Sequence, residues 1–255
     1  MKNGENMINL KGIKHWIFAQ PQAKPNGIKL LSKLTRREFN PWGPDKDYYL
    51  KSRAEYTADG LKLSVGPDKT VYFDWNNWKW SYEQMNDDDQ IYTCSSGRAD
   101  TKDKQVIDIY KPGRIISKTT TPQDGAVLSI WLYFEEHPWD PHKPDRDCYF
   151  ELDIFEMEPS WPTKAAGMIF TDWLGHHHYD SHGKTTRMNR KLEGWHYPEL
   201  SWDGQGRFTW KLDGVVMKRK HVKLPPKIKP YVIYSFYTKH KVTSEGIINW
   251  SIYQK

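Results

Sequence analysis

The chain has 255 residues, of which 37% are hydrophobic and 15% aromatic, and its 38 basic and 32 acidic side chains give a formal net charge of +6. This length fits one globular domain. The small net positive charge is not accompanied by a nucleic-acid-binding motif, which argues against a nucleic-acid partner. No stretch approaches the roughly 20 apolar residues of a membrane helix. We therefore expect residues 1–255 to form a single domain, monomeric and independent of membranes, with an irregular segment over residues 1–25.

Short apolar runs separated by turn residues dominate the chain, and the apolar spacing that is typical of helices is scarce. Asp-Gly pairs, which favour hairpin turns, occur at residues 59–60, 124–125, 203–204 and 213–214. The expected strands, in chain order, cover residues 60–66, 69–76, 104–110, 113–121, 126–134, 148–157, 165–173, 206–218, 231–238 and 246–254. Such a series of short strands predicts an all-β sandwich.

The two cysteines and the N-terminus leave the cellular compartment open. Cys94 and Cys148 can form one disulfide or remain two partly buried thiols, and no paired Cys/His zinc spacing is present. The first residues, MKNGENMINLKGIKHW, contain no apolar signal-peptide region. A secreted or periplasmic location would follow only if a leader had been removed.

Three acids stand close together in ELDIFE, residues 151–156, inside an apolar run that is expected to be a strand. Side chains alternate along a regular strand, so Glu151 and Asp153 would share one face while Glu156 pointed to the other. A β-bulge at residues 154–155 would insert one residue and bring all three acids onto one face. A solvated strand face can show the same pattern, but buried carboxylates are costly unless they are paired or used, which favours a functional site.

Paired carboxylates suggest the chemistry of such a site. Retaining glycoside hydrolases hold two carboxyl groups about 5–5.5 Å apart, one as nucleophile and one as general acid/base. A third acid between them would hydrogen-bond the nucleophile and help to separate the pKa values of the group.

ELDIFE resembles the E-x-D-x-x-E signature of glycoside hydrolase family 16, which includes laminarinases, lichenases, agarases and carrageenases. Further segments are similar to motifs of that family and occur in the family's order: SSGRADTK (95–102), PGRIISKTTTPQDGAVLSIWLY (112–133), WHYPELSW (195–202), FTWKLDGVV (208–216) and INWSIYQ (248–254). The resemblance covers roughly residues 55–255. It implies a concanavalin A-like β-jelly roll of two curved antiparallel sheets, with a substrate cleft across the concave face.

The resemblance also implies roles for the three acids. Glu151 would be the nucleophile, Glu156 the general acid/base, and Asp153 the acid that assists between them. The two-residue spacing before Glu156 is similar to that of the laminarinase and agarase branch, in which this strand carries a bulge. Asn249 stands where the family often has an Asp that helps to hold calcium, so we expect no cofactor and do not count on a structural calcium.

Several aromatic residues and one histidine are candidates for contact with a sugar. Trp131 resembles the family's Trp beside the nucleophile, and we expect it to stack on the substrate, although a core position is the alternative. Trp173 ends the strand after the acids. Trp139 and Trp161 fall in loops that flank the acid strand. In GHHHYDSHG (175–183) we favour a substrate-binding loop, with His178 as a contact, over a zinc site, because adjacent histidines on a strand cannot all face one ion.

Taken together, these patterns predict an endo-acting retaining glycoside hydrolase that cleaves a β-linked polysaccharide, either a β-glucan or a red-algal galactan. Two other functions stay open. One is a non-catalytic carbohydrate-binding jelly roll that keeps the acids as hydrogen-bond acceptors. The other is a transglycosylase, which differs only in whether sugar or water accepts the glycosyl group.

Overall fold

The protein is described by a computed structural model that is almost entirely β. It covers residues 5–10, 13–18, 23–38, 47–74, 76–77, 79–87, 89–122, 125–135, 149–157, 165–166, 169–173, 176–180, 194–221, 224, 228–238 and 242–255. The helices in these ranges are two 3₁₀ turns, η1 (Leu30–Lys33) and η2 (Lys51–Arg53). No helix in the described part of the chain is long and apolar enough to cross a membrane.

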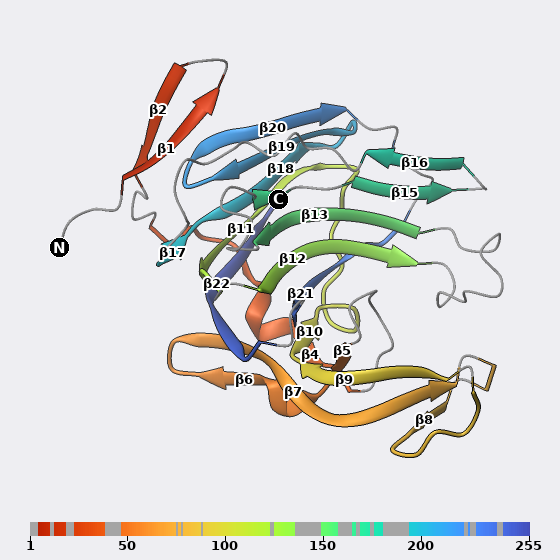
Figure 1. Cartoon of the computed structure of the whole chain (residues 1–255). Coiled ribbons are helices and arrows are strands. Elements are labelled where there is room, and N and C mark those ends of the chain that lie inside the picture. The colour runs from red at the N-terminus through yellow and green to blue at the C-terminus, as the bar shows by residue number, and fades with distance from the viewer. Residues whose placement is uncertain are drawn as a thin grey trace.

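Two large curved sheets form the body of the molecule (Figure 1). The eight-stranded sheet runs β16 (His176–Asp180), β15 (Ile169–Trp173), β13 (Tyr149–Met157), β12 (Ala126–Glu135), β21 (Tyr231–Thr238), β10 (Arg98–Asp100) and β4 (Thr35–Arg36), with β14 (Ala165–Ala166) beside β13. The predicted jelly-roll sandwich is therefore confirmed, and this sheet carries the acid strand β13.

The second sheet has twelve strands. Its main path runs β20 (Val215–His221), β19 (Arg207–Leu212), β18 (Pro198–Asp203), β11 (Pro112–Thr120), β22 (Ser244–Gln254), β7 (Gly60–Asp74), β9 (Gln90–Ser96) and β5 (Asp47–Tyr49). Four short strands pair beside this path: β17 (Trp195–His196), β3 (Ile28–Lys29), β6 (Ala54–Thr57) and β8 (Lys79–Ser81). Pairing is antiparallel except between β5 and β9, which are parallel.

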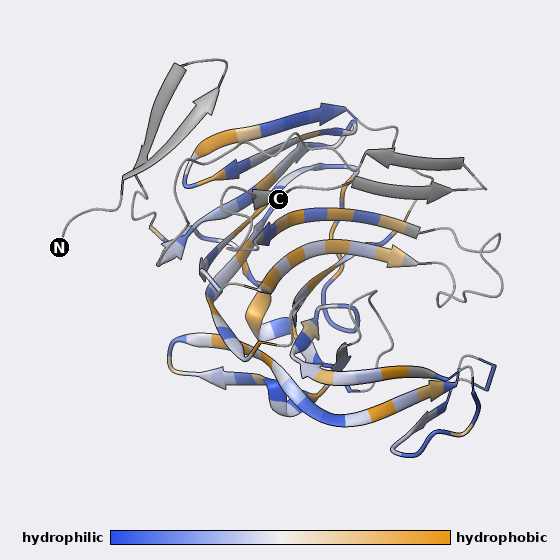
Figure 2. Ribbon diagram, viewed as in Figure 1, coloured by the Kyte–Doolittle hydropathy of each residue, from blue (hydrophilic) through white to orange (hydrophobic). Residues whose placement is uncertain are grey.

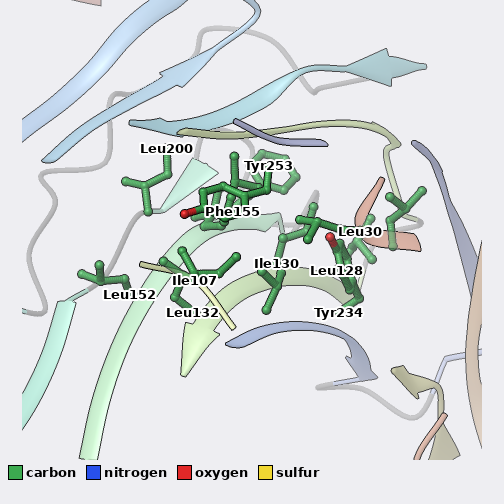
Figure 3. Packing of buried hydrophobic residues seen from close by; sticks show 14 of the residues in the cluster. Leu30, Ile107, Leu128, Ile130, Leu132, Leu152, Phe155, Leu200, Tyr234 and Tyr253 are labelled. Atoms are coloured by element: carbon green, nitrogen blue, oxygen red, sulfur yellow. The ribbon is translucent and has the colours of Figure 1, made fainter. Parts of the chain in front are cut away.

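Alternating side chains produce the core between the two sheets. On β12, Leu128, Ile130 and Leu132 are fully buried in it, and Leu200 and Tyr253 meet them from the opposite sheet (Figure 3). The same alternation appears as hydrophobic and hydrophilic bands along β12 and β13 in Figure 2. Each such leucine or isoleucine contributes about 1.5–3 kcal/mol on burial, which holds the two sheets face to face.

The hairpin between β19 and β20 confirms the turn expected at residues 213–214. Asp213 and Gly214 both have positive φ, 52° and 81°, as a two-residue turn of the common hairpin type requires. Asp213 tolerates this conformation because its buried carboxylate accepts the backbone N–H of Tyr197 and contacts Nδ1 of His196, both at 2.8 Å.

The segments 60–66 and 69–76, expected as two strands, give the single strand β7, and the segment 206–218 gives two strands, β19 and β20. Two further expectations about secondary structure are wrong. Residues 104–110 form turns with one isolated bridge at Val106, and not a strand, although Ile107 and Ile109 still reach the core. Residues 1–25 are not irregular throughout, because β1 (Glu5–Leu10) and β2 (Ile13–Phe18) pair as a hairpin apart from both large sheets (Figure 1). Only Lys11 and Gly12 separate these strands, a two-residue connection that the strand prediction overlooked.

Candidate active site

The predicted bulge is present in β13. Trp131 of β12 pairs with Asp153, whereas the preceding residue, Ile130, pairs with Phe155, so Ile154 is the extra residue. Before the bulge along the chain, Phe150 and Leu152 enter the core, and after it Phe155 enters the core. Glu151, Asp153 and Glu156 are therefore brought to the face of the sheet that points away from the core, which we call the acid face.

The acid face extends onto β12 and β21. Directly opposite the three acids on β12 lie Tyr133, Trp131 and Ser129, paired with Glu151, Asp153 and Glu156 in that order. Opposing residues of an antiparallel pair have Cβ atoms about 4.5–5.5 Å apart, so each acid touches or nearly touches its partner's side chain. On β21 the same rows continue into Tyr231, Ile233 and Ser235.

Long hydroxyl contacts reach Glu156, and one oxygen of Asp153 lacks a hydrogen-bond partner among the described residues. Glu156 Oε1 accepts the hydroxyl of Tyr237 at 3.3 Å and that of Ser129 at 3.4 Å, both long contacts. Asp153 is 2% exposed, and its Oδ2 has no hydrogen-bond partner among the described residues. A buried carboxylate with so little compensation is destabilised in its charged form.

The pKa values follow from this environment. Burial, and next the charge of Glu156, raise the pKa of Glu151 to about 8, against a hydrogen bond from Asp153 that lowers it. Burial raises the pKa of Asp153 well above its ordinary range, and the charges of Glu156 and Glu151 raise it further, while Lys218 opposes them. Burial and the crowding of like charges therefore favour the protonated forms of Glu151 and Asp153.

Trp131 lies beside the acids, as predicted. Its indole N–H donates to Ser235 Oγ at 3.0 Å, and its ring meets that of Tyr133 edge-on, with centroids 5.1 Å apart. The guanidinium of Arg98 lies over Trp131 at 5.8 Å and over Tyr49 at 5.4 Å. The Trp131 side chain is only 5% exposed, so stacking on a sugar would need the neighbouring groups to rearrange and stays a prediction.

The other predicted contacts cannot be placed as side chains. Trp139 and Trp161 lie outside the described residues. Trp173 and His178 fall in β15 and β16, where only the backbone is described. In register, His178 pairs with Thr171 and so shares the row of Phe150, while Phe170 and Tyr179 continue the row of Glu151.

The cysteine and metal expectations are tested only in part. Cys94 is buried, and Cys148 lies outside the described residues, so the disulfide stays untested. Among the residues whose side chains are described, no three His, Cys, Asp or Glu side chains gather as metal ligands. The side-chain amide of Asn249, at the position considered for calcium, donates to the Asp59 carbonyl at 2.6 Å.

Several neighbours of the acids were not singled out from the sequence. Ser129 and Tyr133 could have been found, because they lie two residues on either side of Trp131 on the same strand. Arg98 belongs to the segment SSGRADTK, but no role was assigned to it from the sequence. Tyr237 had no local signal, since only the pairing of β21 with β12 carries it to Glu156.

Comparisons with known proteins agree with this fold. No protein-family model matches the chain, and no curated protein sequence matches it. Among solved structures, the catalytic domain of an endo-1,3-β-glucanase (laminarinase) from Thermotoga petrophila is similar with a TM-score of 0.59 at 14% identity, over 90% of this chain and 94% of that one.

Two enzymes named for galactans are equally similar. The κ-carrageenase from Pseudoalteromonas carrageenovora, in complex with an oligotetrasaccharide of κ-carrageenan, has a TM-score of 0.55 at 14% identity, over 91% of this chain and 97% of that one. The β-porphyranase from Bacteroides plebeius has a TM-score of 0.60 at 13% identity, over 90% of this chain and 88% of that one. The chain thus has the fold of family 16 glycoside hydrolases, and at these identities the likeness extends to the fold alone.

Proposed function

We propose that this protein is an endo-acting glycoside hydrolase that cleaves a β-linked polysaccharide with retention of configuration. One observation carries the proposal: the bulge in β13 puts Glu151, Asp153 and Glu156 on one face of a strand whose other face is core. A bulge that turns a third acid toward two others in a buried site gathers like charges, so it does not stabilise the fold. A functional role for the three acids explains it better.

Each of the two outer acids has a chemical task in this mechanism. The Glu151 carboxylate attacks the anomeric carbon as the glycosidic bond breaks, while Glu156 donates its proton to the departing oxygen. Glu156 then takes a proton from water, the water oxygen attacks the anomeric carbon, and the ester to Glu151 is released. Glu151 ends as a carboxylate and Glu156 ends protonated, so the cycle closes.

The raised pKa of Glu151 is compatible with its role as nucleophile. The charge of Glu156 is one of its causes, so Glu151 ionises more easily whenever Glu156 carries the proton that it must donate. A hydrogen bond from protonated Asp153 further favours the carboxylate form of Glu151. The reaction needs Glu156 protonated and Glu151 charged, and protonation of Glu156 lowers the pKa of Glu151 toward that arrangement.

The substrate class rests on the fold and on the aromatic surroundings. Proteins with this fold are named for β-1,3-glucan, κ-carrageenan and porphyran. Trp131, Tyr133 and Tyr231 form a buried aromatic cluster beside the acids, and aromatic rings stack on the apolar faces of sugars once the neighbouring groups rearrange to expose them. We therefore propose a β-glucan or a red-algal galactan as the substrate.

A screen of purified protein on laminarin, mixed-linkage β-glucan, agarose, porphyran and κ-carrageenan, read as newly formed reducing ends, tests the proposal. Cleavage that Glu151→Gln abolishes supports it. Absence of cleavage, together with glycan binding that Glu151→Gln leaves unchanged, would instead show a carbohydrate-binding protein. Products longer than the starting oligosaccharide would identify a transglycosylase.

A further inference from the structure

We infer that Trp210, on the sheet opposite the acids, is a positioning residue that holds the β13 bulge and thereby aims Asp153 and Glu156. Trp210 lies on β19 and is 3% exposed. Its indole N–H crosses the core and donates to the backbone carbonyl of Asp153 at 2.7 Å, with both atoms buried. The inference rests on the proposed function, in which these acids do the chemistry.

The bulge explains why this carbonyl is bonded by a side chain. On its outer side, β13 pairs with β15 up to Leu152 and with β14 from Glu156 onward, so Asp153, Ile154 and Phe155 have no partner there among the described pairings. On the inner side the extra residue, Ile154, interrupts the ladder with β12. A buried carbonyl without a partner destabilises the fold, and the Trp210 indole N–H supplies that partner.

This hydrogen bond acts on the acids through one peptide group. The Asp153 carbonyl belongs to the peptide that joins Asp153 to the extra residue Ile154. The orientation of that peptide decides whether the chain beyond it resumes with Phe155 in the core and Glu156 on the acid face. Without the indole N–H, the peptide can rotate toward another partner, and the carboxyl groups on its two sides lose their relative orientation.

Lys218 contacts Trp210 from the neighbouring strand of the same sheet. It pairs in register with Trp210, and its ammonium lies over the Trp210 ring, 5.4 Å from the centroid. Its positive charge lowers the pKa of Asp153 against the stronger effect of burial. The same tryptophan thus holds the bulge and supports a charge that acts on the acid trio.

A purely structural role for Trp210 is the rival explanation, and Trp202 is the matched control. Trp202 lies on the neighbouring strand β18 and is 5% exposed. Its indole N–H also donates to a backbone carbonyl, that of Asp108 at 3.2 Å, which lies in the segment between β10 and β11 and not on β13. Replacing either tryptophan with phenylalanine removes one buried N–H donor and similar volume, but only one of the two donors reaches the bulge.

The experiment compares Trp210→Phe with Trp202→Phe in the full chain, on the substrate that the wild type cleaves. We expect both to lower Tm by similar amounts. We expect Trp210→Phe to lower kcat about tenfold or more, with KM changed less than about threefold, and to move the pH profile of kcat/KM. Trp202→Phe should leave both kcat and the profile near wild type. Equal kcat values and unmoved profiles in the two variants would overturn the inference.

A second measurement does not depend on activity or on the folding of a variant. In ¹⁵N-labelled wild-type protein, the Trp210 indole resonance should shift with pH along the titration of the acid trio, while that of Trp202 should not. If the chemical shift of the Trp210 indole N–H does not change as the three acids titrate, the inference is contradicted. If the wild type cleaves no substrate on the panel, the proposed function fails, and this titration still decides the role of Trp210.

Discussion

The loop that follows β7 and the acid face both hold buried acids, and their surroundings differ. At the start of the loop that follows β7, Asp74, the last residue of that strand, accepts the backbone N–H groups of Asn76 and Asn77 and the side-chain amides of Asn77 and Asn86. Asp89 accepts the N–H groups of Met85 and Asn86. These hydrogen bonds lower the pKa of both groups. On the acid face the pKa values of Glu151 and Asp153 are raised instead, because burial and like charge dominate there.

The backbone explains this difference. A loop can turn successive N–H groups toward one carboxylate, whereas a strand uses its N–H groups in the ladder and has none to offer a neighbouring side chain. Acids in the loop are thus held as charged structural acceptors. Glu151 and Asp153 on β13 have raised pKa values instead, which is typical of groups used in acid–base chemistry.

The largest expected effect is a loss of kcat that occurs on substitution of acids on the acid face but not on substitution of an acid in the loop that follows β7. Glu151→Gln removes the proposed nucleophile and Glu156→Gln the proposed proton donor, so each should lower kcat by roughly 10³-fold or more. Reducing-end assays on the preferred substrate measure this. Asp74→Asn is the control, because it changes a buried acid of the loop and should leave kcat within about twofold. Comparable losses in all three variants would show that the acids on β13 have no special role.

The middle acid should have a smaller effect that depends on the replacement. Asp153→Ala removes the group that hydrogen-bonds Glu151 and should lower kcat by about 10–100-fold. Asp153→Asn keeps a hydrogen-bond donor and should retain more activity. A variant pair with identical kcat would argue that Asp153 acts through its charge or volume and not through its hydrogen bond to Glu151.

The proton coupling within the trio predicts a shift in pKa. In Glu156→Gln, one cause of the raised Glu151 pKa disappears, so the pKa should fall from about 8 toward its ordinary value of 4.5. NMR titration of ¹³C-labelled glutamate side chains measures this in the folded protein. Asp74→Asn again serves as the control and should leave the Glu151 titration unchanged.

Stability should depend on pH with opposite signs in the two regions. Because its pKa is raised on folding, Glu151 binds more protons in the native than in the unfolded state between about pH 4.5 and 8, so its contribution to stability falls as pH rises through that window. Glu151→Gln should therefore gain Tm relative to wild type at pH 8 and little at pH 4.

Asp74 should show the reverse dependence in the same melting experiment. Its pKa is lowered on folding, so its stabilising contribution is present above its unfolded value of 3.8 and is lost as pH falls below it. Asp74→Ala should lower Tm at neutral pH by a few degrees, and the difference should shrink in acid. A constant difference across pH would show that the hydrogen bonds do not depend on the charge of Asp74.

Local pattern was sufficient for much of the fold. Alternation in β12, β13 and β21 and the Asp-Gly turns predicted strands and hairpins, because period-two burial is a property of each strand alone. The same parity argument predicted the bulge in β13 from the position of Glu156. It failed at residues 104–110, where Ile107 and Ile109 alternate like a strand but reach the core from turns.

The surroundings of the acids depended on contacts between distant segments. Residue types and spacing in ELDIFE were enough to single out Glu151, Asp153 and Glu156. Neither the raised pKa of Glu151, nor Tyr237 beside Glu156, nor Trp210 behind the bulge could be read from local sequence. These follow from which strands become neighbours and which sheet lies opposite, and burial, charge proximity and hydrogen bonds across the core arise only when the two sheets pack together.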